Sequence, residues 1–370
     1  MVSFNSRVNK ISPYIPGKPE EELKRELGLD HIVKLASNES PMGVSPLVKE
    51  ALLHEIERVP LYPDDTYLTL KKKLALRHGV TPQEIVLGNG SVELIKNIVS
   101  SSYEPGDRFL ISRQSFMMYH QAVQEYAGEE AVRWVETKDY AFDMEEFIRI
   151  VREEKRIKAV FIANPNNPTG SFIPEETLLR FLENCPPETL VVMDEAYALF
   201  ADAEGFASAL KWRDRFPNLI VLETFSKAFG LAGLRVGYGI AHPEVASSIM
   251  KVRLPFHISR LSVAAALAAL DDEEFLQKTL ENNRRGKAFL LREIEATGFR
   301  VIPSQANFLL FLPPRDPIAL VKAMERRGVI VRSLVAFGVP EGIRVTVGTE
   351  EQNNIFLKAF KEAVKEVYHG

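Results

Sequence analysis

Short apolar runs rich in β-branched residues alternate with segments of helical periodicity over roughly residues 40–250. In one such segment, Leu94, Ile95, Ile98 and Val99 recur at the spacing of a single helix face. Nearly continuous apolar strands that alternate with amphipathic helices are typical of a mostly parallel sheet covered on both faces. The pattern therefore predicts an α/β fold with strands at residues 84–87, 108–111, 131–134, 159–162, 190–193 and 219–222.

The rest of the chain has a different pattern. A helix-rich stretch over residues 261–296 precedes strands at 299–302, 308–311, 329–331 and 343–347 and helical segments at 317–327 and 350–367. This mixture predicts a smaller α+β domain. The N-terminal segment contains Pro13, Pro16, Gly17 and Pro19, which predicts an arm over the surface. We therefore expect an arm or part of the small domain over residues 1–36, a large domain over 37–255 and a small C-terminal domain over 256–370.

Composition and charge narrow the classes of function. The chain has 370 residues, of which 46% are hydrophobic, and its formal net charge is −4. Its basic residues are scattered, so neither a nucleic acid nor an anionic membrane is an expected partner. The single Cys185 and the lack of a basic-then-apolar leader at the N-terminus favour the cytoplasm. The longest apolar stretch, around residues 263–270, is too short to span a membrane. The seven histidines are dispersed along the chain, so no metal site is expected.

Candidate chemistry is concentrated in residues 224–235, directly after the last strand of the predicted sheet. This segment places Ser226, Lys227 and Arg235 among small and apolar residues. Burial disfavours the charged form of an amine, and Schiff-base chemistry with a carbonyl cofactor needs an uncharged amine. A serine and an arginine nearby are suited to a phosphate. The segment therefore fits a binding site for pyridoxal phosphate. Taken alone, it fits a surface lysine before a glycine turn equally well.

A glycine-containing turn follows the strand predicted at residues 84–87. It runs through Gly88 and Gly90 to Ser91 and Val92, where a helix is expected to begin. Glycine lets the backbone approach an anion, and the free N–H groups of a helix N-terminus attract one. The turn is therefore a candidate phosphate site, with an ordinary glycine turn as the alternative. The sequence has neither a P-loop nor the full dinucleotide-binding glycine spacing, which disfavours ATP and NAD enzymes.

Two further predicted strands end in polar motifs. Asn167 lies in an Asn-Pro-rich turn after residues 159–162, and its amide could donate to a cofactor oxygen. Asp194 and Tyr197 follow residues 190–193, where a buried acid is costly unless it is paired. A pyridinium nitrogen would pair with this acid, and a helix N-cap is the alternative role. Because ligands bind outside the carboxyl ends of parallel strands, all these motifs are expected to share one edge of the sheet.

The motifs, taken in this order, resemble those of class I and II, fold-type I aminotransferases that use pyridoxal phosphate. Within that group the chain most resembles the histidinol-phosphate aminotransferases. The resemblance runs nearly end to end, through segments 12–19, 34–39, 61–64, 164–170, 194–197, 226–227 and 344–349. It implies a large domain with a mostly parallel sheet flanked by helices, a smaller α+β domain, and a homodimer with active sites at the subunit interface.

The resemblance also implies roles for individual residues. Lys227 would carry the cofactor covalently and move a proton at the substrate's Cα, and Asp194 would keep the pyridine nitrogen protonated. The other implied cofactor contacts are Tyr197 and Asn167 at the ring oxygen, Phe116 on the ring face, Ser226, Arg235 and the backbone of Ser91 and Val92 at the phosphate, and Tyr62 from a neighbouring subunit. The implied substrate contacts are Arg344, which would take the anionic group, Tyr14, Asn38 and Arg332. Plain core packing is the alternative for Phe116, and a solvated strand-end charge is the alternative for Arg332.

The implied reaction is a reversible ping-pong transamination between a small-molecule amino donor and 2-oxoglutarate. The expected donor is histidinol phosphate, which would give imidazole acetol phosphate and glutamate in histidine biosynthesis. Ser40, Leu61, Val92 and residues 333–338 depart from the family pattern. The departures other than Val92 lie near the expected substrate side, and a pocket for imidazole can admit another ring. An aromatic amino acid aminotransferase therefore stays as an alternative, as does a threonine-phosphate decarboxylase, which resembles the same family. A DNA-binding regulator built on this fold is not favoured, because few residues precede Ser37.

Overall fold

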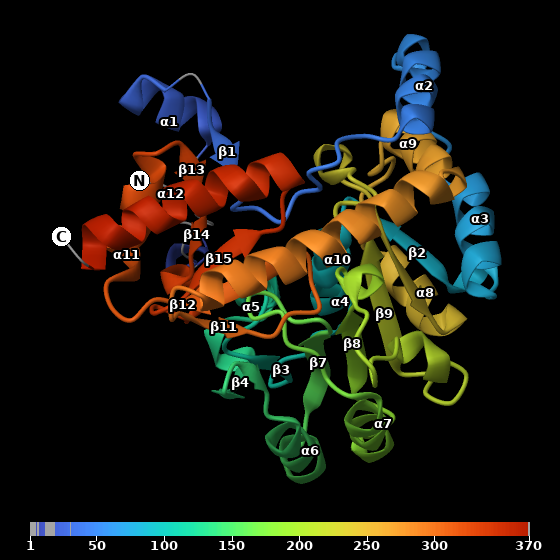
Figure 1. The fold of residues 1–370 in the computed structure, drawn as a ribbon. Helices are drawn as coiled ribbons and strands as arrows, with labels where there is room; N and C mark the ends of the chain where they lie inside the picture. The colour runs from blue at the N-terminus through green and yellow to red at the C-terminus, as the bar shows by residue number, and fades with distance from the viewer. Residues whose placement is uncertain (1–4, 6, 12–18, 30, 369–370) are drawn as a thin grey trace.

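A seven-stranded sheet forms the centre of the molecule (Figure 1). The computed structural model describes residues 5, 7–11, 19–29 and 31–368. The strand order is β2 (Ile85–Gly88), β10 (Gly237–Ala241), β9 (Leu219–Thr224), β8 (Leu190–Asp194), β7 (Ile157–Ala163), β3 (Arg108–Ser112) and β4 (Val132–Val135). All neighbouring pairs are parallel except the two that involve β10. The predicted mostly parallel sheet is thus confirmed.

Helices cover both faces of this sheet, which explains why its strands are apolar throughout. Along β7, Phe161 packs toward one face and the adjacent Val160 toward the other, and both are fully buried. The first face is covered by α4 (Ser91–Ser102), α5 (Met117–Tyr126) and α8 (Pro243–Met250). The second face is covered by α6 (Met144–Glu153) and α7 (Glu175–Asn184), and toward β2 by α3 (Leu68–His78) and α9 (Arg260–Asp271).

Strand β10 has no counterpart in the sequence-based prediction, because its Gly-Tyr-Gly segment is typical of a turn. The structure gives both glycines a steric reason. A Cβ on Gly239 would lie 2.8 Å from Val86 Cγ2, and a Cβ on Gly237 would lie 2.6 Å from the backbone nitrogen of Ser91. The two glycines therefore allow β2 and the start of α4 to lie close against β10.

A second layer of α and β structure is built mainly by the C-terminal part of the chain. Its antiparallel sheet has the order β11 (Arg300–Ile302), β12 (Phe308–Leu312), β15 (Ile343–Thr346) and β14 (Arg332–Ser333). It packs with α11 (Pro317–Glu325), α12 (Glu350–Tyr368) and the end of α10 (Glu273–Glu295). Two small sheets pair β1 (Val33–Lys34) with β13 (Val329–Ile330) and β5 (Thr137–Lys138) with β6 (Ala141–Phe142).

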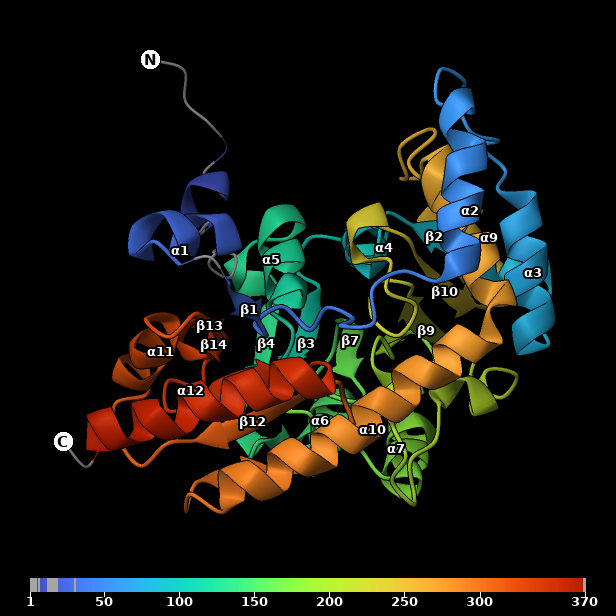
Figure 2. The same ribbon diagram turned by 45° about the horizontal axis from the view of Figure 1, so that its top comes forward.

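Helix α10 joins the two layers and runs diagonally across the molecule (Figures 1 and 2). Its Leu276 packs into the core around α3 and α9, whereas Leu290 and Ile294 pack into the core of the C-terminal sheet. Because α9 packs on α2 (Pro46–Glu55) and α3, we propose that α9 belongs to the large domain. The predicted division at residues 36 and 255 otherwise stays a prediction.

Near the N-terminus, α1 (Glu20–Leu27) packs its buried Leu23 with Ala36 and with Ile330 of β13. Pro13, Pro16 and Gly17 lie outside the described residues. No helix in the described part of the chain combines the length and apolar character needed to cross a membrane. Short 3-10 helices occupy Val8–Lys10, Ile56–Arg58, Pro82–Glu84, Glu129–Ala131, Ala198–Phe200, Ala209–Trp212, Ala232–Leu234 and Val335–Phe337.

Candidate functional site

A cavity of about 220 Å³ lies at the carboxyl ends of the parallel strands, where the large sheet meets β14 and β15. This is the edge at which the sequence predicts the polar motifs to converge. Most of the predicted site residues line this one cavity: Asn38, Ser91, Val92, Phe116, Asn167, Asp194, Tyr197, Ser226, Lys227, Arg235, Arg332 and Arg344.

Among the predicted site residues that the structure describes, Tyr62 alone is not part of the cavity's lining. Tyr14 falls outside the described residues. Tyr62 is 77% exposed and stacks on Phe256, with ring centroids 4.5 Å apart, on an outer surface of the chain. A contact between Tyr62 and the cavity of a neighbouring subunit stays a prediction.

One corner of the cavity is suited to an anion. Helix α4 begins at Ser91, and its N-cap Gly90 has a φ of 75° and offers no side-chain cap, which leaves the first N–H groups for a ligand. Arg235 lies so close that a Cβ on Gly90 would be 2.4 Å from its Nη2 atom. Arg235 Nη1 donates to Ser226 Oγ at 3.3 Å. A helix N-terminus, a guanidinium and a hydroxyl therefore converge on one place.

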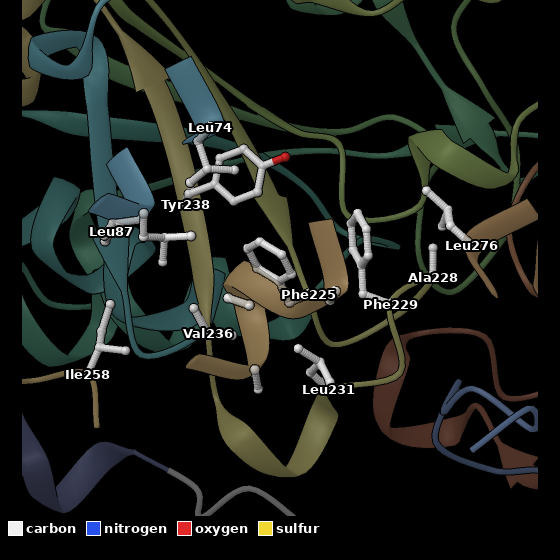
Figure 3. Packing of buried hydrophobic residues seen from close by; sticks show 14 of the residues in the cluster. Leu74, Leu87, Phe225, Ala228, Phe229, Leu231, Val236, Tyr238, Ile258 and Leu276 are labelled. Carbon is white, nitrogen blue, oxygen red and sulfur yellow. The ribbon is translucent and has the colours of Figure 1, made fainter. Parts of the chain in front are cut away.

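Apolar side chains that precede and follow Lys227 in the sequence hold the loop after β9, and Figure 3 shows two of them, Phe225 and Phe229, in the core. Phe225 and Phe229 are buried, their ring centroids are 4.9 Å apart, and Phe225 also contacts Tyr238. Because these residues anchor the loop in the core, the intervening lysine is directed to the cavity. Its Nζ donates to the carbonyl oxygens of Asn38 at 3.2 Å and Ser37 at 3.4 Å.

Asp194 ends β8 at the base of the cavity and is 4% exposed. Tyr119 donates its hydroxyl to Asp194 Oδ2 at 2.8 Å, and the backbone N–H of Ala196 donates to Oδ1 at 3.1 Å. Burial raises the pKa of Asp194, and these two hydrogen bonds and the charge of Lys227 act in the opposite direction. A buried carboxylate in this position would be stabilised by a cationic partner in the cavity.

Sequence reasoning assigned no role to Tyr119. It lies three positions after Phe116 and lines the same cavity. Residues three apart share a face of a helix, so a helix predicted to begin near Phe116 would have placed Tyr119 toward the same site. The two rings meet edge to face with centroids 5.6 Å apart. The three-residue spacing from Phe116 is therefore the feature of the sequence that could have identified Tyr119 as a site residue.

Asn38 connects the cavity to the C-terminal layer. Its side chain donates to the hydroxyl of Tyr197 at 3.0 Å, and its backbone N–H donates to Thr346 Oγ1 at 3.0 Å. Asn307 donates to its carbonyl oxygen at 3.2 Å. Asn38 has a φ of 55°, a left-handed conformation that asparagine tolerates better than most residues. The residue predicted to contact substrate is thus held beside Tyr197.

The opposite wall of the cavity carries two arginines on adjacent strands. Arg332 of β14 and Arg344 of β15 are direct cross-strand partners. Arg344 donates to Asn167 Oδ1 at 2.5 Å and to the carbonyl oxygen of Ala36 at 2.9 Å. The two guanidinium carbons lie 5.2 Å and 5.7 Å, respectively, from the ring centroid of Phe337. Like charges directly opposite each other are unfavourable, so this wall is suited to an anionic ligand.

Comparison with known proteins gives a consistent result. A family model described as aminotransferase class I and II matches residues 30–360. Histidinol-phosphate aminotransferase 2 of Carboxydothermus hydrogenoformans is 43% identical over 96% of this chain and 97% of its own length. The histidinol-phosphate aminotransferase of Caldicellulosiruptor saccharolyticus is 40% identical over 98% of this chain and 100% of its own length. The crystal structure of histidinol-phosphate aminotransferase from Sinorhizobium meliloti with pyridoxal-5'-phosphate is 28% identical, with a TM-score of 0.89 over 99% of both chains. This chain therefore belongs to the class I and II aminotransferases.

Proposed function

We propose that this aminotransferase transfers the amino group of histidinol phosphate to 2-oxoglutarate, with pyridoxal phosphate as its cofactor. The observation that carries the proposal is that one cavity joins Lys227 and Asp194 to two arginines on its opposite wall. Relatives named histidinol-phosphate aminotransferase, at 40% identity or more over nearly the whole chain, support the same substrate.

The residues of the cavity fit pyridoxal phosphate. The anion corner formed by Arg235, Ser226 and the start of α4 would hold the phosphate. Asp194 is the buried acid whose carboxylate a protonated ring nitrogen would stabilise. Phe116 would cover a ring face, and Asn167 and Tyr197 would bond the ring oxygen. When bound, the cofactor supplies an electron sink for the labile bond at the substrate's Cα.

The chain's own residues then position the substrate and move its proton. Lys227 would hold the cofactor between turnovers and take the proton from the substrate's Cα. Arg344 and Arg332 would bind the substrate's anion. Histidinol phosphate presents a phosphate and 2-oxoglutarate presents carboxylates, and the planar fork of arginine fits both groups. A single anion site can therefore serve both halves of a ping-pong reaction.

We propose a homodimer as the active unit, on the basis of an exposed apolar surface next to Tyr62. Val59, Leu61, Tyr62 and Phe256 line one hollow of this surface and are exposed by 41–77%. Contiguous exposed apolar patches mark interaction sites. Arg253 holds this surface together through two contacts of 2.7 Å to the carboxylate of Asp65, and Phe256 N–H donates to the same carboxylate. We also propose a cytoplasmic location, where the single Cys185 would stay reduced.

The test is an absorbance scan of the purified protein, titrated separately with glutamate, histidinol phosphate and phenylalanine. We expect a visible band of the bound cofactor that is absent from Lys227→Ala. Histidinol phosphate should convert the band at much lower concentration than phenylalanine. A preference for phenylalanine would make the enzyme an aromatic aminotransferase, and the absence of any such band would overturn the cofactor assignment.

A further inference from the structure

The β5–β6 hairpin of the large domain reaches across to the C-terminal layer. Its two tip residues, Asp139 and Tyr140, both have left-handed backbones, with φ values of 48° and 65°. Two-residue hairpins of this kind favour Asn-Gly or Asp-Gly, because a side chain at positive φ is strained. A tyrosine at such a position is uncommon and is retained where the surrounding contacts hold it. The contacts made by Tyr140 therefore hold the tip of the hairpin in this conformation.

Both tip residues bond to the C-terminal layer. The Tyr140 hydroxyl donates to Glu341 Oε1 at 2.6 Å, and Glu341 lies in the turn before β15. Asp139 forms an ion pair of 2.5 Å with Arg300 at the start of β11, and the Arg300 guanidinium lies 5.6 Å from the Tyr140 ring. Burial and the hydrogen bond to Glu341 raise the pKa of Tyr140 to about 12, so the hydroxyl keeps its proton at neutral pH. The hairpin thus contacts two separate elements of the small sheet.

The ring of Tyr140 packs against a small apolar cluster that leads back to the cavity. The cluster contains Leu310, Leu334, Phe337, Ile302 and Val339. Phe337 is both a member of this cluster and a wall of the cavity. Its ring is the one that both cavity arginines contact. A continuous chain of packed side chains therefore runs from the hairpin tip to the anion-binding wall.

A second tether acts on the same segment. Gln114 Nε2 donates to the carbonyl oxygen of Gly338 at 3.0 Å, and Gly338 ends the 3-10 helix η8 (Val335–Phe337) that carries Phe337. Thr137 of β5 donates its hydroxyl to Gln114 Oε1. The hairpin and Gln114 thus hold the segment that directly follows η8 at two points, Gly338 and Glu341.

We propose that the β5–β6 hairpin clamps η8 and thereby positions Phe337 and the two cavity arginines for the anionic group of the substrate. Tyr140 and Gln114 are positioning residues for substrate binding, and neither lines the cavity. This inference rests on the proposed function for the identity of the anion. The clamp itself is a property of the contacts and can be tested separately.

The test compares Tyr140→Phe and Gln114→Ala with the wild-type holoenzyme in steady-state assays with histidinol phosphate and 2-oxoglutarate. Each variant loses one hydrogen bond to the η8 segment, so we expect KM to rise about three- to ten-fold and kcat to change less than about two-fold. Glu341→Ala should match Tyr140→Phe, and Glu341→Gln should restore KM because its amide oxygen can accept the same bond. Tyr368→Phe is the matched control. Tyr368 also donates one hydrogen bond, 2.6 Å to Arg315 O, but it packs in the outer part of the small domain and should leave KM unchanged.

Hydrogen–deuterium exchange over residues 335–342 provides a readout that does not depend on the substrate. We expect faster exchange in Tyr140→Phe and Gln114→Ala and no change in Tyr368→Phe. If exchange rises but the wild type does not use histidinol phosphate, the proposed function falls and the clamp stands. If the wild type is active but KM stays within about two-fold in both variants, or kcat falls with loss of cofactor instead, the positioning role is overturned.

Discussion

The two walls of the cavity are built in different ways. The wall that would hold the cofactor comes from consecutive strand ends of one sheet, with Asp194 and Lys227 each fixed by the strand or core residues beside them. The wall that carries Arg332 and Arg344 comes from two short strands of the small sheet, which has its own core and is also held by contacts from distant parts of the chain. The first wall is anchored by the core of the large sheet, and the second by the separate core of the small sheet together with tethers to the large sheet's layer. Substitutions in the two walls should therefore have different signatures.

The largest effect is expected for Lys227→Ala, which removes the group that would hold the cofactor and move the substrate's proton. We expect kcat/KM to fall by at least about 10³-fold, since the variant loses the proton carrier at the substrate's Cα. The measurement is single-turnover and steady-state kinetics at saturating cofactor. Lys278→Ala is the control, because Lys278 forms only an exposed ion pair with Glu274 on α10. Near-normal turnover by Lys227→Ala would remove the central assignment of this site.

Arg344→Lys should separate the two walls. Lysine keeps the charge but loses the planar fork that now bonds Asn167 and the Ala36 carbonyl. We expect kcat/KM for both histidinol phosphate and glutamate to fall about 10- to 100-fold, while the affinity of the cofactor, which rests mainly on Lys227, Asp194 and the anion corner, changes much less. Arg332→Lys should show the same pattern with a smaller loss. Loss of cofactor affinity in Arg344→Lys would mean that the walls are not independent.

More of the first wall than of the second could be predicted from the sequence. The reason is the separation along the chain between the residues that contact one another. Lys227 and Asp194 are adjacent to apolar strands whose patterns are local, so their placement could be predicted. Tyr119 bonds Asp194 from 75 positions away, and Tyr140 bonds Glu341 from 201 positions away, and neither pairing leaves a local pattern. Strand β10 was missed for a different reason, because the glycines that let α4 and β2 approach also resemble a turn.

Tyr119→Phe tests the buried partner within the first wall. The hydrogen bond from Tyr119 lowers the pKa of Asp194, which burial raises, so its removal should raise that pKa further. At a given pH less Asp194 would then be ionised, and the acid limb of the kcat/KM profile should shift to higher pH. We expect about a ten-fold loss near neutral pH, the lower end of what one hydrogen bond to a charged group contributes. Tyr103→Phe, on the same side of the sheet but away from the cavity, is the control. A uniform loss with no shift of the acid limb would contradict this role.

The smallest effect on activity is expected for Glu195→Gln, which probes how the first wall is anchored rather than its chemistry. Glu195 follows Asp194, is 3% exposed, and accepts a hydrogen bond of 2.6 Å from Ala209 N–H. Burial raises its pKa to about 8 from the usual 4.5, and the nearby Glu223 and Asp194 act in the same direction. The folded protein therefore retains a proton that the unfolded chain releases above pH 4.5, and the stability that this proton contributes is lost as the pH rises toward 8.

A glutamine at this position can accept the same hydrogen bond from Ala209 without ever titrating, so the comparison of the two side chains isolates the cost of the buried acid. We expect Glu195→Gln to raise the midpoint of thermal unfolding at pH 8.5 by about 1–2 °C, equivalent to about 1 kcal/mol for a chain of this length, and to leave it nearly unchanged at pH 4.5. Glu281→Gln, an exposed α10 residue paired with Arg284, should show no such gain. If Glu195→Gln instead lowers the midpoint at both pH values, the ionised carboxylate itself supports the loop after β8. The first wall would then depend on a charge, as the second wall does, and the two walls would no longer differ in how they are stabilised.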